Sequence, residues 1–337
     1  MSSRSDGRYG ACKVENLCHV QTKETEILSL NESQRDAIRE RFFQELPDSA
    51  LAKHSIGRKC LVAKAVQSSA DNIAPHWSIL KVIEHCMDCN KYLPNISDHL
   101  MPIQDSMYYR ENIYKNKREI ENICHLTMEQ NNDLWKKERS IRVTGSVCYE
   151  LYTYGRRKNA DWEKKLTNIF RSKFKGNENT EYGKKWEKTA LTLYGTLYGC
   201  DVKQFGLIIS PLLTCFAFSP DGIVFNDEKP IKLLEVKCPK IGAEKSAEEM
   251  VQFLKYIVHD GHGNYSLKKN HKYYGQVQLG LAILNLNSCD FVIFSSKDQT
   301  LKTLEVLADY SFIYKLTEKL LNDFTKIIFP YLCSHNS

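Results

Sequence analysis

The succession of short apolar runs between residues 202 and 296 constrains the fold of this chain more than any other feature. Segments rich in β-branched and aromatic residues, separated by turn-forming residues, predict short strands. These segments span 202–210, 212–219, 222–226, 231–238 and 289–296. The segment HKYYGQVQLGLAILN at 271–285 has helical spacing and lies before the last of them. Adjacent hairpin strands, a helix and a further strand predict a mixed α/β fold, with a central sheet flanked by helices.

The first third of the chain has mainly helical spacing. Asn31 and Gln34 have the form of a capping box, and Pro47 ends the helix that would follow them. The segment His76–Leu93 predicts a second helix, and most of Tyr108–Ser140 predicts a long polar one. A further helix is expected over EYGKKWEKTALTLYGTLYG, just before the strands. Helices therefore precede the predicted sheet.

Composition and charge limit the class of protein. The chain has 337 residues, 42% hydrophobic and 26% charged, which is typical of a globular protein with a packed core. No apolar run approaches the roughly 20 residues of a membrane span, and the start, MSSRSDGRYG, lacks the apolar segment of a signal peptide. The 12 scattered cysteines favour reduced thiols. We therefore expect an intracellular protein, nuclear or cytoplasmic, that does not act in a membrane.

The stretch AFSPDGIVFNDEKPIKLLEVKCPK at 217–240 places charged residues where a sheet would half-bury them. Strand alternation puts Glu235 and Lys237 on one face, and a hairpin would bring Asp221 beside Glu235. Two neighbouring carboxylates repel each other unless a divalent cation lies between them. Mg²⁺ prefers oxygen ligands, and the carbonyl of Val236 could add one. Lys237 could then assist an attacking water, which is the chemistry of phosphodiester hydrolysis.

An ordinary hairpin with charged rims would contain the same fragments, because Pro-Asp-Gly turns and Glu-x-Lys strands are common. Other polar residues favour a site. Gln276 and Gln278 interrupt the apolar stripe of the predicted helix at 271–285. Glu187 is expected on the buried side of the helix before the strands, near Tyr194. Each of these residues alone could be a rim residue, but their joint order supports an active site.

Four motifs in this order resemble a known family. They are G-K-x-x-E at 183–187, S-P-D-G at 219–222, E-V-K-C-P at 235–239 and Y-x-x-Q-V-Q at 273–278. The set is similar to the YqaJ-like viral recombinase family, the lambda-type exonuclease branch of the PD-(D/E)xK nucleases. WKKERSIRVTGS at 135–146 is similar to the family's segment of Trp, Arg and Thr-x-Ser. The resemblance implies a restriction-endonuclease-like core in a nuclease domain at 131–337, behind a mainly helical region at 1–130 of unknown role.

The resemblance also implies roles for the charged residues. Asp221 and Glu235, with the carbonyl of Val236, would bind a catalytic Mg²⁺, for which Mn²⁺ can substitute. Lys237 would assist the water. Glu187 would be a further acidic member that serves the metal site.

Other residues correspond to substrate contacts of the family. Gln276 would orient Lys237 or the scissile phosphate. Arg139, Ser146 and Arg156 match positions that hold the terminal phosphate of a DNA end, and guanidinium and hydroxyl groups suit that ligand. Arg157 adjoins Arg156 and could take its role.

The implied activity is that of a Mg²⁺-dependent deoxyribonuclease acting on double-stranded DNA ends from 5′ to 3′. Basic clusters interleaved with aromatic residues between 136 and 188 suit a DNA backbone, as the net charge of +6 permits. By resemblance alone, the chain would form a ring-type trimer and work with a recombinase or a single-strand annealing protein. Two alternatives remain open: a catalytically weak DNA-binding module derived from a nuclease, and a PD-(D/E)xK endonuclease.

The cysteines offer a competing hypothesis. Cys86 and Cys89, in a C-x-x-C pair after His85, could contribute to a zinc site. The other ligands would come from His76, His99, Cys12, Cys18 or His19. An iron–sulfur cluster is not expected, because only Cys289 and Cys333 lie near the C-terminal end. Cys238 is expected to pack in the sheet.

Overall fold

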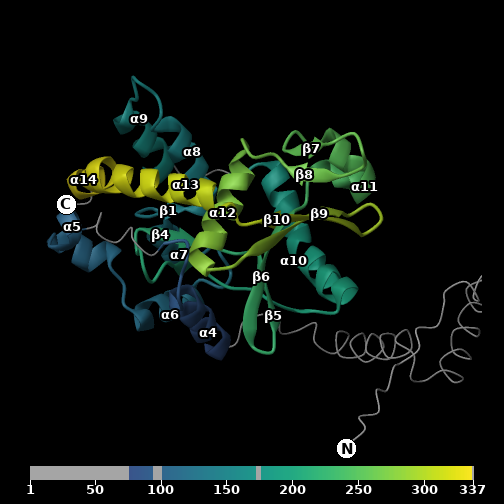
Figure 1. Ribbon diagram of the computed structural model, residues 1–337, viewed down its shortest axis with the longest axis horizontal. Coiled ribbons are helices and arrows are strands. Elements are labelled where there is room, and N and C mark those ends of the chain that lie inside the picture. The colour runs from purple at the N-terminus through teal and green to yellow at the C-terminus, as the bar shows by residue number, and fades with distance from the viewer. Residues whose placement is uncertain (1–75, 94–100, 172–175, 336–337) are drawn as a thin grey trace, which may run out of the picture. The chain divides into compact units, whose positions relative to one another are not determined.

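The computed structural model divides the chain into two compact units, residues 1–61 and 62–337. The described residues are 76–93, 101–171 and 176–335 (Figure 1). All of them belong to the second unit, and the helix predicted after Asn31 lies outside them. The predicted boundary near residue 130 falls within the second unit.

Short helices precede the sheet. They are α4 (His76–Met87), α5 (Met101–Gln104), a π-helical turn (Tyr109–Ile113), α6 (Lys117–Leu126) and α7 (Asp133–Arg139). The long helix predicted over 108–140 is therefore interrupted. Asn116 accepts hydrogen bonds from the N–H groups of Arg118 and Glu119 and begins α6 with a capping box, and Asn132 caps α7. Asparagine favours such caps over helix interiors, which explains where the chain breaks.

The main sheet has five strands in the order β10-β9-β6-β5-β2. Figure 1 labels β5, β6, β9 and β10 of this sheet. They are β2 (Asp201–Lys203), β5 (Gly222–Asn226), β6 (Lys229–Lys237), β9 (Ser288–Ser295) and β10 (Thr300–Leu307). Strands β6 and β9 are parallel, and the other neighbours are antiparallel. The predicted mixed α/β class is confirmed, including its mixed sheet.

Smaller sheets accompany the main one. A three-stranded sheet has the order β1-β4-β3, and β7 pairs with β8. Their bounds are β1 (Val143–Thr144), β3 (Ile208–Ile209), β4 (Phe216–Phe218), β7 (Ile257–His259) and β8 (Tyr265–Leu267). The apolar run predicted as one strand at 202–210 is divided, because its two ends enter different sheets as β2 and β3.

Two helices bury opposite faces of the main sheet. Leu234 and Val236 of β6 pack with residues of α10 (Glu178–Tyr198). Leu233, on the opposite face of the same strand, belongs to the core that includes Leu279 and Leu281 of α12 (Lys272–Leu284). Strand alternation thus sends adjacent residues of β6 into separate cores. The charged residues near its end are held between these layers.

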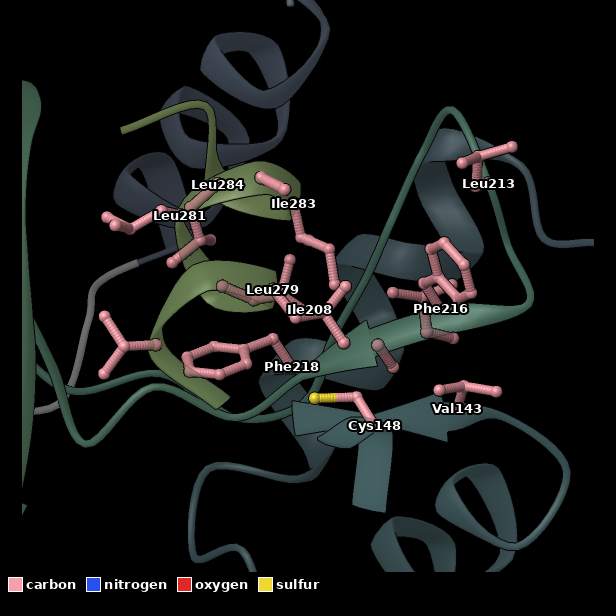
Figure 2. Packing of buried hydrophobic residues seen from close by; sticks show 14 of the residues in the cluster. Val143, Cys148, Ile208, Leu213, Phe216, Phe218, Leu279, Leu281, Ile283 and Leu284 are labelled. Carbon is pink, nitrogen blue, oxygen red and sulfur yellow. The ribbon is translucent and has the colours of Figure 1, made fainter. Parts of the chain in front are cut away.

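Phe218 of β4 packs closely against both α8 (Gly145–Tyr154) and α12. Figure 2 shows it among buried residues of these elements. A Cβ atom on Gly280 would lie 2.6 Å from the Phe218 ring, and one on Gly145 would lie equally close, at 2.6 Å. Glycine at both positions therefore lets the two helices close on one aromatic ring.

The remaining helices are α9 (Trp162–Leu166), α11 (Ala247–Met250), α13 (Tyr310–Asp323) and α14 (Phe329–His335). π-helical turns occupy Thr167–Arg171 and Phe324–Ile328, and 3-10 turns occupy Lys240–Ala243 and Val251–Phe253. None of the helices in the described ranges is both long and apolar enough to cross a membrane.

Candidate active site

The register of the β5–β6 hairpin brings Asp221 to the end of β6. Gly222 pairs with Leu234, and the tight turn between the strands contains Asp227 and Glu228 with positive φ values of 45° and 65°. Asp221 Oδ2 accepts a hydrogen bond of 2.7 Å from the N–H of Val236. One strand pairing therefore places the first predicted carboxylate beside the Glu-Val-Lys segment.

Glu235 and Lys237 lie together on the same face of β6. The Lys237 ammonium donates to Glu235 Oε1, and it lies 3.9 Å from Asp221 Oδ2. It also donates to the carbonyl of Val236 at 3.1 Å. The Glu235 side chain is completely buried, whereas those of Lys237 and Asp221 keep 19% and 15% of their surface exposed. The site is thus closed beneath and reachable from one side.

The two glutamines of α12 have different partners. Gln276 Nε2 donates to Glu235 Oε1 at 2.5 Å, which places it in the predicted cluster. Gln278 donates from Nε2 to the Leu307 carbonyl at 2.9 Å and accepts from the Asp309 N–H at 2.8 Å. Gln278 therefore joins α12 to the end of β10, which accounts for a polar residue in an apolar stripe.

Glu235 Oε2 has no hydrogen-bond partner among the described residues, although it is buried. Its other oxygen receives both Lys237 and Gln276. A buried carboxylate oxygen without a donor is costly, and a hard cation is a ligand that would satisfy it. The donor chemistry of Asp221, Glu235 and the Val236 carbonyl therefore fits Mg²⁺.

The described residues contain no group of three or more His, Cys, Asp or Glu side chains that could hold a metal ion. Mg²⁺ does not require such a group, because it usually keeps several waters and binds through one or two carboxylates plus substrate phosphates. An all-protein cage of the kind that structural zinc needs is a different arrangement.

The electrostatics of the cluster are those of crowded, buried acids. Burial, with the charge of Asp221 added, raises the pKa of Glu235 to about 7 and that of Glu187 to about 8. Burial also raises the pKa of Asp221. Burial acts to lower the pKa of Lys237, but the carboxylates of Glu235 and Asp221 outweigh it and raise that pKa. The cluster can therefore release protons when a cation enters.

Glu187 joins the cluster from α10. Its side chain is half-buried and interacts electrostatically with Asp221, Lys237 and Glu235. Tyr194, its predicted neighbour, instead donates to Asp290 at 2.5 Å, farther along the sheet. The structure thus brings Glu187 to the site and assigns Tyr194 to a separate buried contact.

Arg139 and Ser146 form a second cluster. Arg139 Nη2 donates to Ser146 Oγ at 2.8 Å, and the guanidinium lies 4.1 Å from the ring centre of Trp135. Ser146 Oγ is also 3.3 Å from Thr144 Oγ1. Burial lowers the pKa of Arg139 to about 10, which still leaves it charged at neutral pH. A cation, two hydroxyls and the first turn of α8 are together suited to a phosphate.

Arg156 lies away from this pair. It follows the opposite end of α8, is exposed, and lies 5.4 Å from the ring centre of Tyr152. Since a helix rises about 1.5 Å per residue, its backbone is roughly 15 Å along the axis from Ser146. Arg157 is likewise exposed, 5.1 Å from the ring centre of Tyr154. Of the three predicted phosphate ligands, two are in contact and the third is separate.

The two clusters are neighbours. Trp135 Nε1 donates to Ser219 Oγ at 3.0 Å, two residues before Asp221. A Cβ atom on Gly145 would lie 3.3 Å from Gln276 Cγ. The motifs contain all of these residues, but sequence reasoning missed the contacts because they join segments far apart in the chain.

Among the described residues, the proposed zinc ligands do not form a group that could hold a metal ion. Cys86 is completely buried in the core, whereas Cys89 is exposed. His85 Nε2 lies 3.2 Å from the Asn285 carbonyl. Burial raises the pKa of Cys238 to about 12, as expected for a thiol packed against the sheet. The His76 side chain, His99, Cys12, Cys18 and His19 lie outside the described residues.

Comparisons with known proteins identify the region that holds both clusters. A search of the curated proteins finds no match. An alkaline exonuclease from Laribacter hongkongensis is 21% identical, with 61% of this chain and 96% of that chain covered and a TM-score of 0.46. A SOX protein in complex with DNA is 13% identical, with coverages of 64% and 72% and a TM-score of 0.44. A phage-related exonuclease from Haemophilus somnus 129PT is 16% identical, with coverages of 58% and 96% and a TM-score of 0.40. The family model of the YqaJ-like viral recombinase domain matches residues 134–287, the region that contains both clusters.

Proposed function

We propose that the chain is a Mg²⁺-dependent deoxyribonuclease that hydrolyses phosphodiester bonds at the ends of double-stranded DNA, from 5′ to 3′. The observation that carries the proposal is the buried Glu235 Oε2, which has no partner in the described part of the chain and lies beside Asp221 and Lys237, within the residues matched by the YqaJ-like viral recombinase model. Such an oxygen is what a hard cation requires, and the cation and the lysine together suit a phosphodiester.

Asp221, Glu235 and the Val236 carbonyl would hold Mg²⁺, or Mn²⁺ in its place. The bound ion supplies Lewis acidity and neutralises charge on the scissile phosphate. Lys237 and Gln276 both donate to Glu235 Oε1, so Oε2, which has no partner among the described residues, would be available to a cation. With its raised pKa, Lys237 stays protonated and stabilises negative charge on the phosphate.

Glu187 is the additional acid of this site. Burial and the charge of Asp221 raise its pKa to about 8, so it can hold a proton near neutral pH. It would ionise as positive charge arrives and complete the acidic side of the site. Its position on α10, opposite α12, lets it approach the phosphate from the other layer.

The pair Arg139 and Ser146 would bind the terminal 5′-phosphate. The guanidinium already points at the hydroxyl, so a phosphate could receive hydrogen bonds from both groups. Arg156 would reach this phosphate only if its side chain leaves the ring of Tyr152. The neighbouring Trp135 links this pocket to Ser219, just before Asp221. An end held here would lie beside the carboxylates.

The deciding experiment compares DNA topologies. Purified protein is incubated in Mg²⁺ with linear, nicked and covalently closed duplexes of the same sequence, each labelled at an end where it has one. Degradation of linear duplex alone supports the exonuclease. Discrete fragments from closed circles would indicate an endonuclease. Salt-sensitive binding without product, in Mg²⁺ or Mn²⁺, would leave a DNA-binding module. Ca²⁺ serves as the control ion, because it should support binding with poor hydrolysis.

The proposal extends to assembly and compartment. We propose a ring-type trimer, an interaction with a recombinase or a single-strand annealing protein, and action inside the cell, in the nucleus or cytoplasm. Light scattering of the protein with and without a linear duplex would measure its oligomeric state. A monomer under both conditions would exclude the ring.

A further inference from the structure

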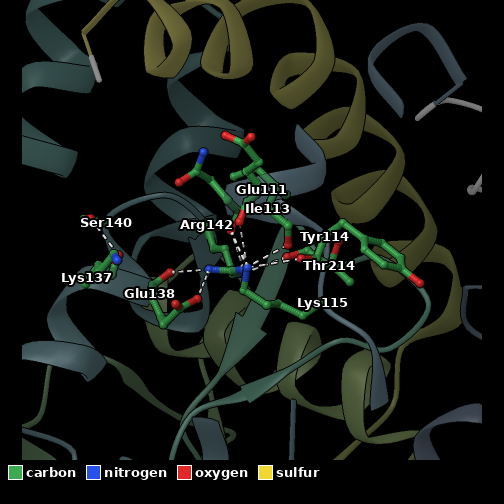
Figure 3. A network of polar contacts seen from close by, with 10 residues as sticks. Glu111, Ile113, Tyr114, Lys115, Lys137, Glu138, Ser140, Arg142 and Thr214 are labelled. Carbon is green, nitrogen blue, oxygen red and sulfur yellow. Dashed lines mark hydrogen bonds and ion pairs between the residues drawn. The ribbon is translucent and has the colours of Figure 1, made fainter. Parts of the chain in front are cut away.

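Arg142 has its guanidinium fully buried, although the basic run KKERSIR suggests an exposed face (Figure 3). Its Nη1 donates to Glu138 Oε2 at 2.5 Å and to the Glu138 carbonyl at 3.0 Å. Nε donates to the Thr214 carbonyl at 2.8 Å. Nη2 donates to the carbonyls of Ile113 at 2.9 Å and Asn112 at 3.2 Å. Every nitrogen of this guanidinium therefore has an acceptor.

These acceptors come from three separate parts of the chain. Glu138 belongs to α7, Asn112 and Ile113 to the π-helical turn at 109–113, and Thr214 to the loop before β4. Figure 3 shows Arg142 between them. The planar guanidinium fixes directions as well as distances, because its donors form a rigid fork. Arg142 therefore sets how α7 lies against β4.

The proposed terminal-phosphate pocket, formed by Arg139 and Ser146, is connected to Arg142 through the chain in both directions. Arg139 is the residue after Glu138, and its carbonyl accepts a hydrogen bond of 3.4 Å from the N–H of Arg142. Ser146 follows Arg142 by one short strand, β1, which pairs with β4. A change in the angle of α7 would move Arg139 relative to Ser146, whereas Glu235 lies on β6 of the other sheet and Asp221 directly precedes β5 of that sheet.

Stability alone is a weak reason for this pair. Replacing a buried ion pair with apolar residues of similar volume is often neutral or stabilising, whereas removing one partner is costly. Glu138 and Arg142 have 7% and 0% of their side-chain surfaces exposed, so the desolvation cost is high. An apolar pair could fill the same volume, but it could not reproduce the directed hydrogen bonds that Arg142 makes to three segments.

We propose that Arg142 is a positioning residue for the terminal-phosphate pocket: it holds Arg139 against Ser146 and so sets the preference for a phosphorylated DNA end without touching the substrate. The inference rests on the proposed function, because it gives a physical origin for end selectivity at the same site.

The test is the ratio of kcat/KM for linear duplexes with a 5′-phosphate and with a 5′-hydroxyl. The double variant Glu138→Leu/Arg142→Met removes the charges together and keeps apolar volume. We expect the ratio to fall roughly tenfold to a hundredfold, the size of effect that a displacement of about 1 Å can have. Arg142→Lys keeps the charge but cannot reach three segments, so the same fall is expected from it. The loss should appear in KM for phosphorylated ends.

Asn90→Ala is the matched control. Asn90 is a buried clamp that donates to the carbonyls of Cys86 and Ala282, far from α7 in the sequence. Its loss should lower the melting temperature and leave the ratio unchanged. If either Arg142 variant melts like the control and keeps the wild-type ratio, Arg142 only stabilises the fold and the inference is overturned.

Binding separates this inference from the proposed function. Fluorescence anisotropy in Ca²⁺ gives the affinity for both duplex ends without cleavage. A wild-type protein that neither prefers phosphate nor cuts DNA contradicts the proposed function and the inference with it. A wild-type preference that persists in Arg142→Lys and in the double variant overturns only the inference. A preference lost in those variants and kept in Asn90→Ala supports it.

Discussion

Glu235 shows how one side chain can define a site. One of its oxygens receives Lys237 and Gln276, and the other receives no donor from the described residues. The asymmetry costs folding free energy, since a buried carboxylate needs partners for both oxygens. An unfavourable contribution of this kind, concentrated at one residue, is typical of functional sites.

Glu235→Gln should abolish cleavage, because an amide is a much weaker cation ligand than a carboxylate. The same variant should melt at or above the wild-type temperature in EDTA, since it removes a buried charge whose pKa is already raised to about 7. End-labelled duplex and thermal unfolding provide the two measurements. Glu305→Gln, an exposed residue of β10, is the matched control. If Glu235→Gln cleaves DNA at the wild-type rate, Glu235 is not part of the catalytic site.

The metal-free protein should lose stability as pH rises from about 4.5 to about 8. Glu235 and Glu187 have pKa values of about 7 and 8 when folded, above their ordinary 4.5, so the folded state holds protons that the unfolded state has released. Stability falls with pH wherever the folded state binds more protons. The neighbouring Asp221 acts in the same direction. Lys237, whose pKa is raised above its ordinary 10.5, is protonated in both states across this window and adds no pH dependence there.

If Mg²⁺ binds as proposed, it should reverse this trend, because it would bind the ionised carboxylates of the folded state. Denaturant titrations at pH 6 and pH 8.5, with EDTA or Mg²⁺, provide the measurement. The stabilisation by Mg²⁺ is expected to be larger at pH 8.5. Equal stabilisation at both pH values would contradict a site built from these acids.

Arg139→Ala should slow cleavage of 5′-phosphorylated ends more than that of 5′-hydroxyl ends. A charge-assisted hydrogen bond contributes about 1.5 to 3 kcal/mol, or roughly tenfold to a hundredfold in rate. Single-turnover cleavage of both substrates measures the difference. Arg156→Ala and Arg157→Ala serve as comparisons, because both exposed side chains lie over tyrosine rings at the far end of α8. If Arg139→Ala slows cleavage of both substrates equally, Arg139 contributes only a general attraction for the DNA backbone.

At the residue scale, the sequence predicts polar groups whose type is unusual for their position. Asp221 and Glu235 could be located because carboxylates in apolar strands are rare, and the motif order added Glu187 and Gln276. Arg142 could not be located in this way. It stands in a run of charged residues that predicts solvent exposure, and its burial depends on three segments meeting around it.

At the element scale, α12 packs closely against Phe218 of β4 near the site. Gly280→Ala would place a Cβ atom 2.6 Å from the ring of Phe218, which must move or strain. Overpacking of this kind costs about 1–3 kcal/mol. Urea unfolding should show that loss, and Phe218→Leu should recover part of it when combined with Gly280→Ala. Full stability in the single variant would mean that α12 can shift freely.

Elements were predictable where periodicity was unbroken. The apolar segment at 271–285 became α12, and the run at 289–296 became β9, each within a residue or so of the predicted bounds. The helix predicted over 108–140 was wrong in its continuity, because asparagine caps at 116 and 132 outweigh helical spacing. Strand β10 was not predicted, because its sequence TLKTLEVL has polar residues on both faces and so lacks a clear alternation. In the structure, half of its residues are half-buried.

At the scale of the whole molecule, contacts join residues before 130 to the region that follows. Ile113 accepts from Arg142, Tyr109 Oη lies 3.3 Å from Thr214 Oγ1, and Gln130 donates to the Pro220 carbonyl at 2.9 Å. The last of these contacts lies next to the carboxylate of the active site. Residues 76–130 therefore contribute to the packing of both clusters.

A fragment of residues 131–337 should be less stable than a fragment of residues 76–337. The shorter one loses the acceptors of Arg142 on the π-helical turn and exposes the apolar residues that face α4 and α6. Thermal unfolding and size-exclusion chromatography of both fragments provide the comparison. Equal melting temperatures would show that the region before residue 131 does not stabilise the rest of the domain.

The β5–β6 hairpin also has a consequence for the order of events during refolding. The bond from Val236 to Asp221 spans 15 positions, whereas the one from Gln276 to Glu235 spans 41. Closing the shorter loop costs less chain entropy, and the parallel pairing of β6 with β9 must wait for the long crossover that contains α12. The carboxylate pair can therefore assemble as a nascent hairpin while the rest of the chain is still collapsing. A cation present at that moment would meet two converging acids before the helix that later orients Glu235 has docked.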